Sequence, residues 1–415
     1  MYLLSRGAGA SDGDSSALDW LTARRLVFCS YAAFISYVGF VATWAWVTHG
    51  FTGTDAGRPG LDFSIFWTAS HLMRHESPAL VYDHQAFVKA TVTLFGGFAN
   101  EYGMPWLYPP AFLVGIAPLS LLPFPISYIA FVSGSVVLFV VAALSVSRLG
   151  RSVQDPRLAA LFVAALPCVF VTAIIGQNSL LTAALAASAV RWLAAKPVLA
   201  GICIGLLAIK PQMAIVFPFV LIAAQAWRTF AAAALSGLAF TTLGALTCGA
   251  RSFHAFLVNA SVMRSATLEH GQHFWMSSPS PFSALRSAGI PVTLSYVVHG
   301  MIAIVAIAAA CQVWRRSSDM RLRASMLAAS TLIVNPYVWH YELAWLGIAL
   351  ACVTACGING RWYLGEQGIL VAGWLLPVYE HFNRVAKLPQ IGPAVVLLTM
   401  LVILRRVRMV AGVKL

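Results

Sequence analysis

The residue whose type and position most clearly suggest chemistry is Asp62, in the segment 60–67 just after the first long apolar run. The chain holds only 14 Asp and Glu among 415 residues. A carboxylate set among aromatic side chains at the edge of an apolar run therefore needs a physical reason. A positioned carboxylate can remove a proton from a hydroxyl group as a general base. The simpler alternative is that Asp62 caps a helix over 63–74, and the two roles are compatible.

A second candidate is Lys210, which with Pro211 and Gln212 interrupts an apolar stretch over 198–226. A cation inside such a stretch is costly and usually functional. It could hold a phosphate group through charge-assisted hydrogen bonds. The alternative is a lysine whose stem lies along apolar surface before a helix-breaking proline. We favour phosphate binding, because Lys210 lies at the boundary opposite to the one where most basic residues gather.

The tight polar turn at 176–179 brings two amides, Gln177 and Asn178, between apolar runs. Their side chains could hydrogen-bond sugar hydroxyls. A plain hairpin turn explains the same residues, because Gly and Asn suit such turns, and from the residues alone it is the simpler explanation.

A last polar turn spans 335–342 and contains Trp339, His340 and Glu342. Aromatic residues are common at membrane interfaces, but a histidine and a glutamate among them are less common. His340 could donate a hydrogen bond to a phosphate or a sugar. Anchoring at the interface remains an equally good explanation of the aromatic residues.

The composition identifies the solvent of this chain as mostly lipid. The sequence is 60% hydrophobic and 10% charged, with mean hydropathy +0.79, whereas soluble domains carry about 25% charged residues. We therefore predict an all-α, polytopic integral membrane protein. The net charge of +13 does not indicate nucleic-acid binding, because the basic residues form short clusters between apolar runs, which is a topology signal.

Twelve apolar runs predict about twelve transmembrane helices in one domain over 26–404, between a polar tail over 1–25 and a basic tail over 405–415. Of 27 basic residues, 18 fall on one side: at 6–25, 148–157, 191–196, 228, 315–323, 361 and 405–414. The positive-inside rule makes that side, and both termini, cytoplasmic. The outer loops would then span about 49–106 and 250–290, the first with amphipathic helices in the interface plane. The proline-rich segment 107–124 is expected to be re-entrant or interfacial.

The sequence carries no sign of a cofactor. The seven cysteines lie in apolar segments without a metal-like pairing, so we expect small buried hydrophobic side chains. His71 with His75, and His270 with His273, have spacings that can bind Zn²⁺. Loop histidine pairs are more often solvated, so no metal is expected. Phosphate-binding glycine loops of the P-loop type and GxSxG motifs do not occur, so nucleotide chemistry is unsupported.

Taken in order, these segments resemble glycosyltransferase family 87, a family of bacterial polyprenyl-phosphate-sugar-dependent membrane enzymes of the GT-C superfamily. Each motif is short, and their order and spacing make the resemblance specific. The matching motifs are Asp62, Tyr82-Asp83, Tyr108-Pro109-Pro110, Gly176-Gln177-Asn178, Lys210-Pro211-Gln212, and Asn335-Pro336 with Trp339-His340.

The resemblance implies a GT-C-type fold in the bacterial cytoplasmic membrane with an outward-facing active site. It implies an inverting, metal-independent transferase that moves mannose or another hexose from a polyprenyl-phosphate-sugar to a hydroxyl of a glycolipid or polysaccharide. By that analogy Asp62 is the base. The donor phosphate and lipid would contact Lys210, His340 and Gln212, and the sugar or acceptor would contact Asp83, Tyr108, Gln177, Asn178, Trp339 and Glu342.

The competing hypothesis is a flippase or transporter of lipids or lipid-linked sugars, which would also need broken helices and intramembrane polar residues. Such a protein is expected to show internal repeats. The two outer loops differ in length and composition, and the turn at Lys210 has no counterpart in the other half. A purely structural membrane subunit would not need Asp62, Lys210 and His340 on one face.

Overall fold

The computed structural model describes residues 20–52, 57–96 and 105–410, and these residues form helices and connecting turns without a strand. Most of the predicted N-terminal tail, residues 1–19, and the last five residues lie outside the described parts, as do 53–56 and 97–104 of the first outer loop. The helices of the first half are α1 Ala23–Val47, α2 Leu61–His75, α3 Pro78–Tyr82, α4 His84–Phe95, α5 Pro110–Ile116, η2 Ala117–Leu121, α6 Phe124–Ser147, α7 Leu149–Ser152, α8 Pro156–Ala164, α9 Pro167–Ile175 and α10 Ser179–Trp192.

The second half of the chain continues the same all-helical pattern. Its helices are α11 Pro197–Gly205, η3 Leu206–Ile209, η4 Pro211–Ala214, α12 Val216–Ala223, α13 Trp227–Cys248, α14 Ala250–Met263, the π-helical turn η5 Arg264–Glu269, α15 Gln272–Met276, α16 Pro281–Ser287, α17 Val292–Arg316, α18 Met320–Val334, η6 His340–Leu343, α19 Ala344–Asn359, α20 Glu366–Ala386 and α21 Gly392–Val410.

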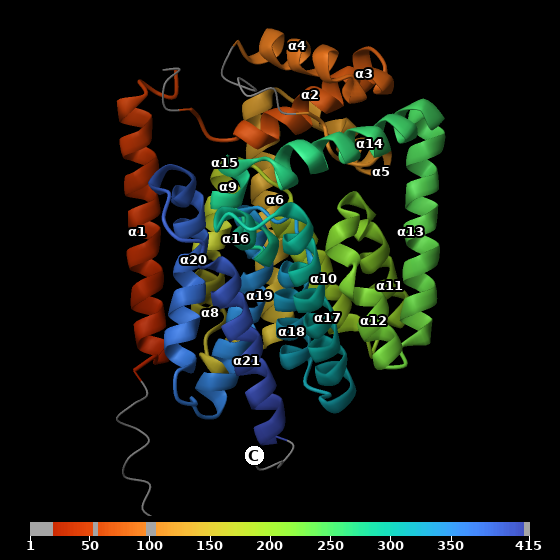
Figure 1. Ribbon diagram of the computed structural model, residues 1–415. Helices are drawn as coiled ribbons and strands as arrows, with labels where there is room; N and C mark the ends of the chain where they lie inside the picture. Colours follow the sequence, from red (N-terminus) through yellow and green to blue (C-terminus); the bar gives the residue numbers. More distant parts are fainter. Residues whose placement is uncertain (1–19, 53–56, 97–104, 411–415) are drawn as a thin grey trace, which may run out of the picture.

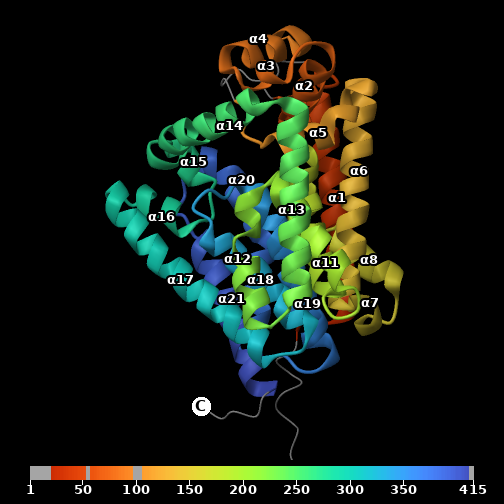
Figure 2. The same cartoon turned by 90° about the vertical axis from the view of Figure 1, so that its right-hand side faces the viewer.

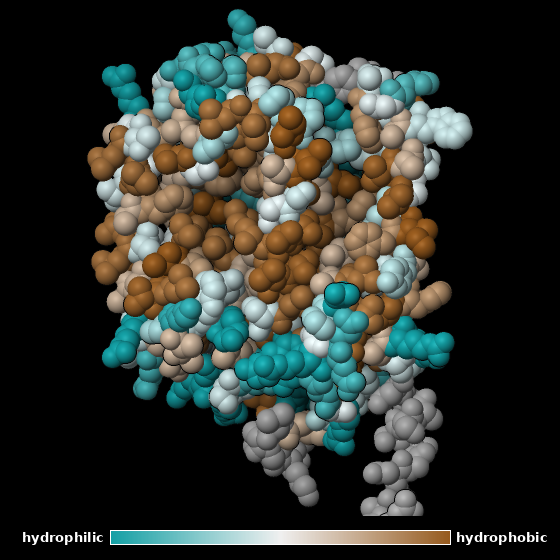
Figure 3. All heavy atoms as spheres, turned by 180° about the vertical axis from the view of Figure 1, so that it is seen from behind, coloured by the Kyte–Doolittle hydropathy of each residue, from teal (hydrophilic) through white to brown (hydrophobic). Residues whose placement is uncertain are grey.

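Five described helices are long and apolar enough to cross a membrane, namely α1, α6, α13, α17 and the continuous helix His340–Asn359. The pair α8 and α9, bent by 55°, adds a sixth if it counts as one span. Hydrophobic side chains form a broad belt between two hydrophilic ends (Figure 3). The chain is therefore a multi-pass membrane protein, and the figure of twelve crossings stays a prediction because four further apolar segments are only 10–17 residues long.

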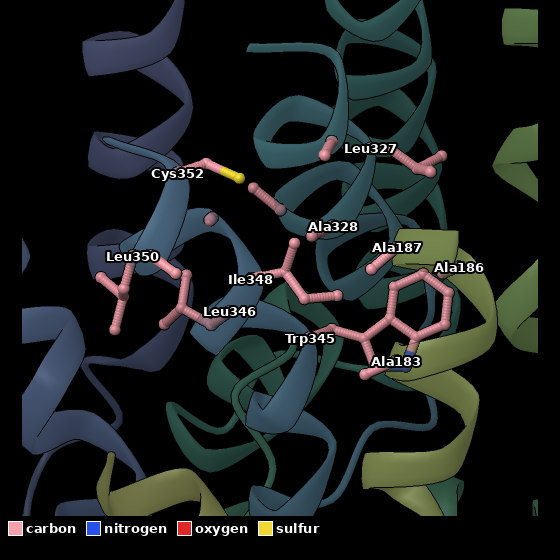
Figure 4. Packing of buried hydrophobic residues seen from close by; sticks show 14 of the residues in the cluster. Ala183, Ala186, Ala187, Leu327, Ala328, Trp345, Leu346, Ile348, Leu350 and Cys352 are labelled. Carbon is pink, nitrogen blue, oxygen red and sulfur yellow. The ribbon is translucent and has the colours of Figure 1, made fainter. Parts of the chain in front are cut away.

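The core of the bundle lies where α10, α18 and α19 meet, and the buried face of α10 is made mostly of alanine. Trp345 of α19 is fully buried, and its indole lies against Ala183 and Ala186 of α10 (Figure 4). Its Nε1 donates to Thr182 Oγ1 at 3.1 Å. Small residues let membrane helices approach closely and gain van der Waals contact without a hydrophobic driving force between them. The three helices thus form a closely packed base beneath their connecting turns.

Several helices around this base are too short to cross a bilayer. Helix α10 has 14 residues and α18 has 15, so each spans about 21–23 Å at 1.5 Å per residue. A hydrocarbon core is about 30 Å thick. The polar turns that precede α10 and follow α18 therefore lie below the end of the bundle, where α2, α3, α4 and α14 lie across them (Figures 1 and 2).

The segment 107–124 lies at one end of the molecule. It forms only the short helices α5 and η2, of seven and five residues. Ser70 Oγ donates to Ala117 O at 2.8 Å and Trp67 Nε1 donates to Leu122 O at 3.0 Å, so η2 is fastened to α2. Helix α6 begins at the same end of the bundle (Figure 1), and the re-entrant or interfacial position of this segment in the membrane stays a prediction.

The first residue of α1, the connection between α17 and α18, and the last turns of α21 lie at the end opposite to α2, α3 and α4 (Figure 1). We expect that end to be cytoplasmic because the basic clusters gather there. In a background without native cysteines, Ser318→Cys should resist a membrane-impermeant maleimide on intact cells, and Gln85→Cys should react. Both positions are exposed, so the comparison reports sidedness. Labelling of Ser318→Cys but not of Gln85→Cys would indicate the opposite topology and contradict an outward-facing site.

Candidate active site

A glycine contact brings Asp62 to the turn at 176–178. Gly60 N donates to Ile174 O at 2.7 Å, and Gly60 and Gly176 both have left-handed backbones, with φ of 79° and 82°. A Cβ on Gly176 would lie 2.6 Å from Phe63 Cβ and 3.3 Å from Gly60 Cα. Only glycine permits this close approach in that conformation. The start of α2 is therefore fixed against the end of α9.

Asp62 is held by an oriented amide. Gln177 Nε2 donates to Asp62 Oδ2 at 2.7 Å, while Gln177 Oε1 accepts from Tyr108 OH at 3.0 Å and from Asn178 N at 3.2 Å. Because two donors occupy Oε1, the amide must present its N–H to the carboxylate. Tyr108 thus sets the orientation of Gln177, and Gln177 sets that of Asp62.

The hypothesis that Asp62 caps a helix is wrong. Gly60 occupies the N-cap of α2 and Asp62 lies in the first turn, where a negative charge interacts favourably with the helix dipole. Burial raises the pKa of Asp62, while the hydrogen bond from Gln177 and the positive charges of Lys210 and Arg384 lower it. The side chain keeps partial solvent access, so the carboxylate is positioned but not sealed.

Lys210 lies at the centre of the polar network. Its Nζ forms a salt bridge with Glu342 and hydrogen-bonds Asn178 Oδ1 at 3.4 Å. The rings of Tyr108 and Tyr341 lie 5.6 Å and 5.2 Å from the ammonium, within cation–π range. Lys210 and Glu342 are only 6% and 2% exposed. The charge of Lys210 is thus compensated inside the protein.

The turn at 210–212 is also joined to the turn at 335. Lys210 breaks the helix between η3 and η4, with φ −146° and ψ 70°, and Pro211 prevents its continuation. Asn335 Nδ2 donates to Gln212 O at 2.8 Å and to Thr331 O at 3.0 Å. Gln212 contributes its main-chain carbonyl to this connection, and its side chain is half-buried.

His340 pairs with a histidine from another helix. His340 Nε2 and His381 Nδ1 lie 3.1 Å apart, and His340 is buried. The neighbouring Trp339 packs edge-on against Phe274, with ring centroids 4.9 Å apart. This contact ties the turn to α15, which lies in the predicted second outer loop.

The structure brings most predicted site residues together and leaves one apart. Asp83 is exposed and caps α4, where its Oδ1 accepts from Ala86 N at 2.9 Å. Tyr82, its neighbour, donates its OH to Tyr108 O at 3.0 Å, so this motif supports the site through Tyr108. Among the described residues there is no group of three or more His, Cys, Asp or Glu side chains that could hold a metal ion.

Two residues of α20, His381 and Arg384, are not among the site residues predicted from the sequence. Both lie in the last turns of α20, after the apolar part of that helix. The positive charge of Arg384 acts on Asp62, His340 and His381. The only signal was a polar run, 380–384, at the end of an apolar stretch, and nothing in the sequence placed it beside His340.

The sequence model of glycosyltransferase family 87 matches residues 106–336, more than half of the chain. This stretch contains Tyr108, Gln177, Asn178 and Lys210, whereas Asp62 and His340 lie outside it. Comparisons with curated proteins and with solved structures gave no match.

The buried ion pair makes a testable contribution to stability. Glu342→Gln leaves the Lys210 ammonium uncompensated, and Lys210→Met does the same to the carboxylate. Removing one partner of a buried pair typically costs about 3–5 kcal/mol. We expect each single variant in detergent to unfold at a clearly lower temperature, and the double variant to lose less than the sum.

Glu76→Gln, which removes an exposed carboxylate, is the matched control and should leave the midpoint unchanged. Single variants as stable as the wild type would show that the pair does not hold the three turns together.

Proposed function

Because the chain belongs to glycosyltransferase family 87, we propose that it transfers a hexose, with mannose the first to test, from a polyprenyl-phosphate-sugar to a hydroxyl of a glycolipid or polysaccharide. Its being a membrane glycosyltransferase, and hence an enzyme, follows from the family itself. The proposal adds the donor, the acceptor class, inversion at the anomeric carbon, and a site facing outward from the bacterial cytoplasmic membrane.

One observation carries the proposal: a carboxylate with partial solvent access, Asp62, is oriented by Gln177 at the mouth of a buried polar network. In the proposed step Asp62 accepts the proton of the acceptor hydroxyl while that oxygen attacks the anomeric carbon. The bond from that carbon to the phosphate oxygen breaks, and its electron pair leaves with the polyprenyl phosphate. A single displacement of this kind inverts the configuration.

The leaving phosphate gains negative charge as the bond breaks, so the site must offer positive potential and hydrogen-bond donors. We assign His340 and Gln212 to the donor phosphate and lipid. Since Lys210 is paired with Glu342, we assign it an electrostatic role on the phosphate rather than the role of an isolated ligand. Gln177, Asn178, Tyr108, Trp339 and Glu342 remain assigned to the sugar and acceptor, directly or through the network.

The depth of the turns supports a lipid-linked donor. An isoprenoid tail dissolves in the bilayer, so its phosphate lies near the interface. Helices of 14 and 15 residues place the turns at 176–178 and 335–342 within the bundle, below its outer end. A donor entering from the bilayer would meet these turns while the acceptor approaches Asp62 from water. A flippase would not need the oriented carboxylate.

The base is tested by Asp62→Asn, which keeps the size of the side chain and removes its basicity. A general base contributes about 10²–10⁴-fold, so turnover with a synthetic polyprenyl-phosphate-mannose should fall at least about 100-fold, with the unfolding temperature and donor binding retained. Asp83→Asn, at an exposed cap, is the control and should stay active. Retention of more than about a tenth of the wild-type turnover would rule Asp62 out as the base.

The pH dependence tests the pairing with Gln177. The base works only when ionised, so activity should fall as the pH drops through the pKa of Asp62, which burial raises. The hydrogen bond from Gln177 lowers that pKa, and Gln177→Met removes it while Lys210 and Arg384 remain. The acid limb of kcat should therefore move to higher pH in Gln177→Met. Tyr108→Phe keeps Gln177 and its N–H donor, so it should shift the acid limb less. If Gln177→Met leaves the acid limb unshifted, that limb does not report the ionisation of Asp62.

A further inference from the structure

Helix α20 carries two residues that face the site and that no motif above includes. His381 and Arg384 are three positions apart and therefore lie on one face of the helix. The helix packs against α9 and η6, the elements that lead to Gln177 and contain His340. Its polar end thus reaches the site beside His340.

The two imidazoles in contact, those of His340 and His381, carry one N–H each when neutral. A neutral imidazole has one N–H, so in the 3.1 Å contact between His340 Nε2 and His381 Nδ1 one nitrogen donates and the other accepts. If His381 donates, His340 carries its proton on Nδ1. That atom is buried and has no hydrogen-bond partner among the described residues. Buried polar atoms are normally satisfied, so an acceptor entering the site, such as a phosphate oxygen, suits this N–H.

The charges around the turns are unevenly balanced. Lys210 is neutralised by Glu342, whereas Arg384 is exposed and forms no ion pair within the described residues. Its charge nevertheless acts on Asp62, His340 and His381. A guanidinium matches phosphate oxygens with paired N–H donors. Of the two cations nearest the site, Arg384 is the one whose charge a ligand can use.

We propose that α20 completes a phosphate site: His381 acts as a positioning residue that directs His340 Nδ1–H toward the phosphate, and Arg384 binds the phosphate oxygens. The proposal rests on the proposed function, since the phosphate is taken to be that of the polyprenyl donor. During transfer the phosphate oxygen retains the electron pair of the broken bond while Asp62 takes the acceptor proton. Arg384 therefore interacts more strongly with the departing phosphate than with the intact donor.

The test measures binding and turnover separately. Binding of a polyprenyl phosphate monoester to the full chain in detergent is followed by thermal stabilisation, with inorganic phosphate as a second probe. Arg384→Gln should weaken binding of the lipid phosphate at least about tenfold, as the loss of a charged hydrogen bond of about 1.5–3 kcal/mol implies. It should lower kcat as well as raise the donor KM, and Arg384→Lys should restore part of both. Lys387→Gln, an exposed charge at the end of the same helix, is the matched control and should resemble the wild type.

The positioning role is tested by rescue. His381→Leu removes the donor to His340 and should lower kcat and phosphate binding. His381→Asn places an amide N–H close to the position of Nδ1 and should recover most of both, which a loss of packing would not predict. If His381→Asn lowers kcat and phosphate binding as much as His381→Leu does, His381 does not orient His340.

The outcomes separate this inference from the proposed function. If the wild type binds lipid phosphate and transfers sugar while Arg384→Gln equals it in both, only the role of Arg384 falls. If the wild type binds neither probe and transfers nothing from a polyprenyl-phosphate-sugar, the donor class and this site are both wrong. Equal stabilisation by inorganic phosphate, lost in Arg384→Gln, would keep the phosphate site and contradict a requirement for the lipid.

Discussion

The arrangement of the site depends on the buried pair between Lys210 and Glu342. Two charges in apolar surroundings are tolerated only when each compensates the other and further hydrogen bonds complete them. The ammonium also donates a hydrogen bond to Asn178 and makes cation–π contacts with the rings of Tyr108 and Tyr341. Lys210, Asn178 and Glu342 come from three different turns, so the contacts of this one lysine fix the relative positions of all three turns. Each turn is polar and precedes or follows a short helix, and none could hold its place in lipid alone.

A second constraint acts at the start of α2. The contact between Gly60 and Gly176 leaves no room for a side chain, and it sets the start of α2 directly beside Gln177. The carboxylate of Asp62 is therefore aimed by backbone geometry and by an amide whose own orientation is set by Tyr108. Catalysis by proton transfer requires this kind of positioning, since a base helps only within hydrogen-bond reach of the proton that it removes.

The chemical composition of the site was predictable from the sequence, whereas its internal pairing was not. Asp62, Lys210 and the amides at 177 and 178 are conspicuous because polar residues in apolar runs need a cause. Such patterns do not indicate which residues are in contact in the folded protein. That Glu342 neutralises Lys210, that Gly60 rather than Asp62 caps α2, and that His381 meets His340 all depend on helices distant in sequence. The prolines of the run 107–124 do limit its helices to a few residues, and its re-entrant or interfacial position in the membrane stays a prediction.

The central claim is that the turns at 177, 210 and 340 bind one lipid-linked donor with its sugar facing Asp62. An experimental structure of the protein with a non-hydrolysable polyprenyl phosphonate sugar tests it most directly. The account predicts the phosphonate beside His340 and Arg384, with the anomeric carbon turned toward the carboxylate of Asp62 and the isoprenoid leaving into the bilayer. A phosphonate bound away from these turns, or a sugar directed away from Asp62, would contradict it.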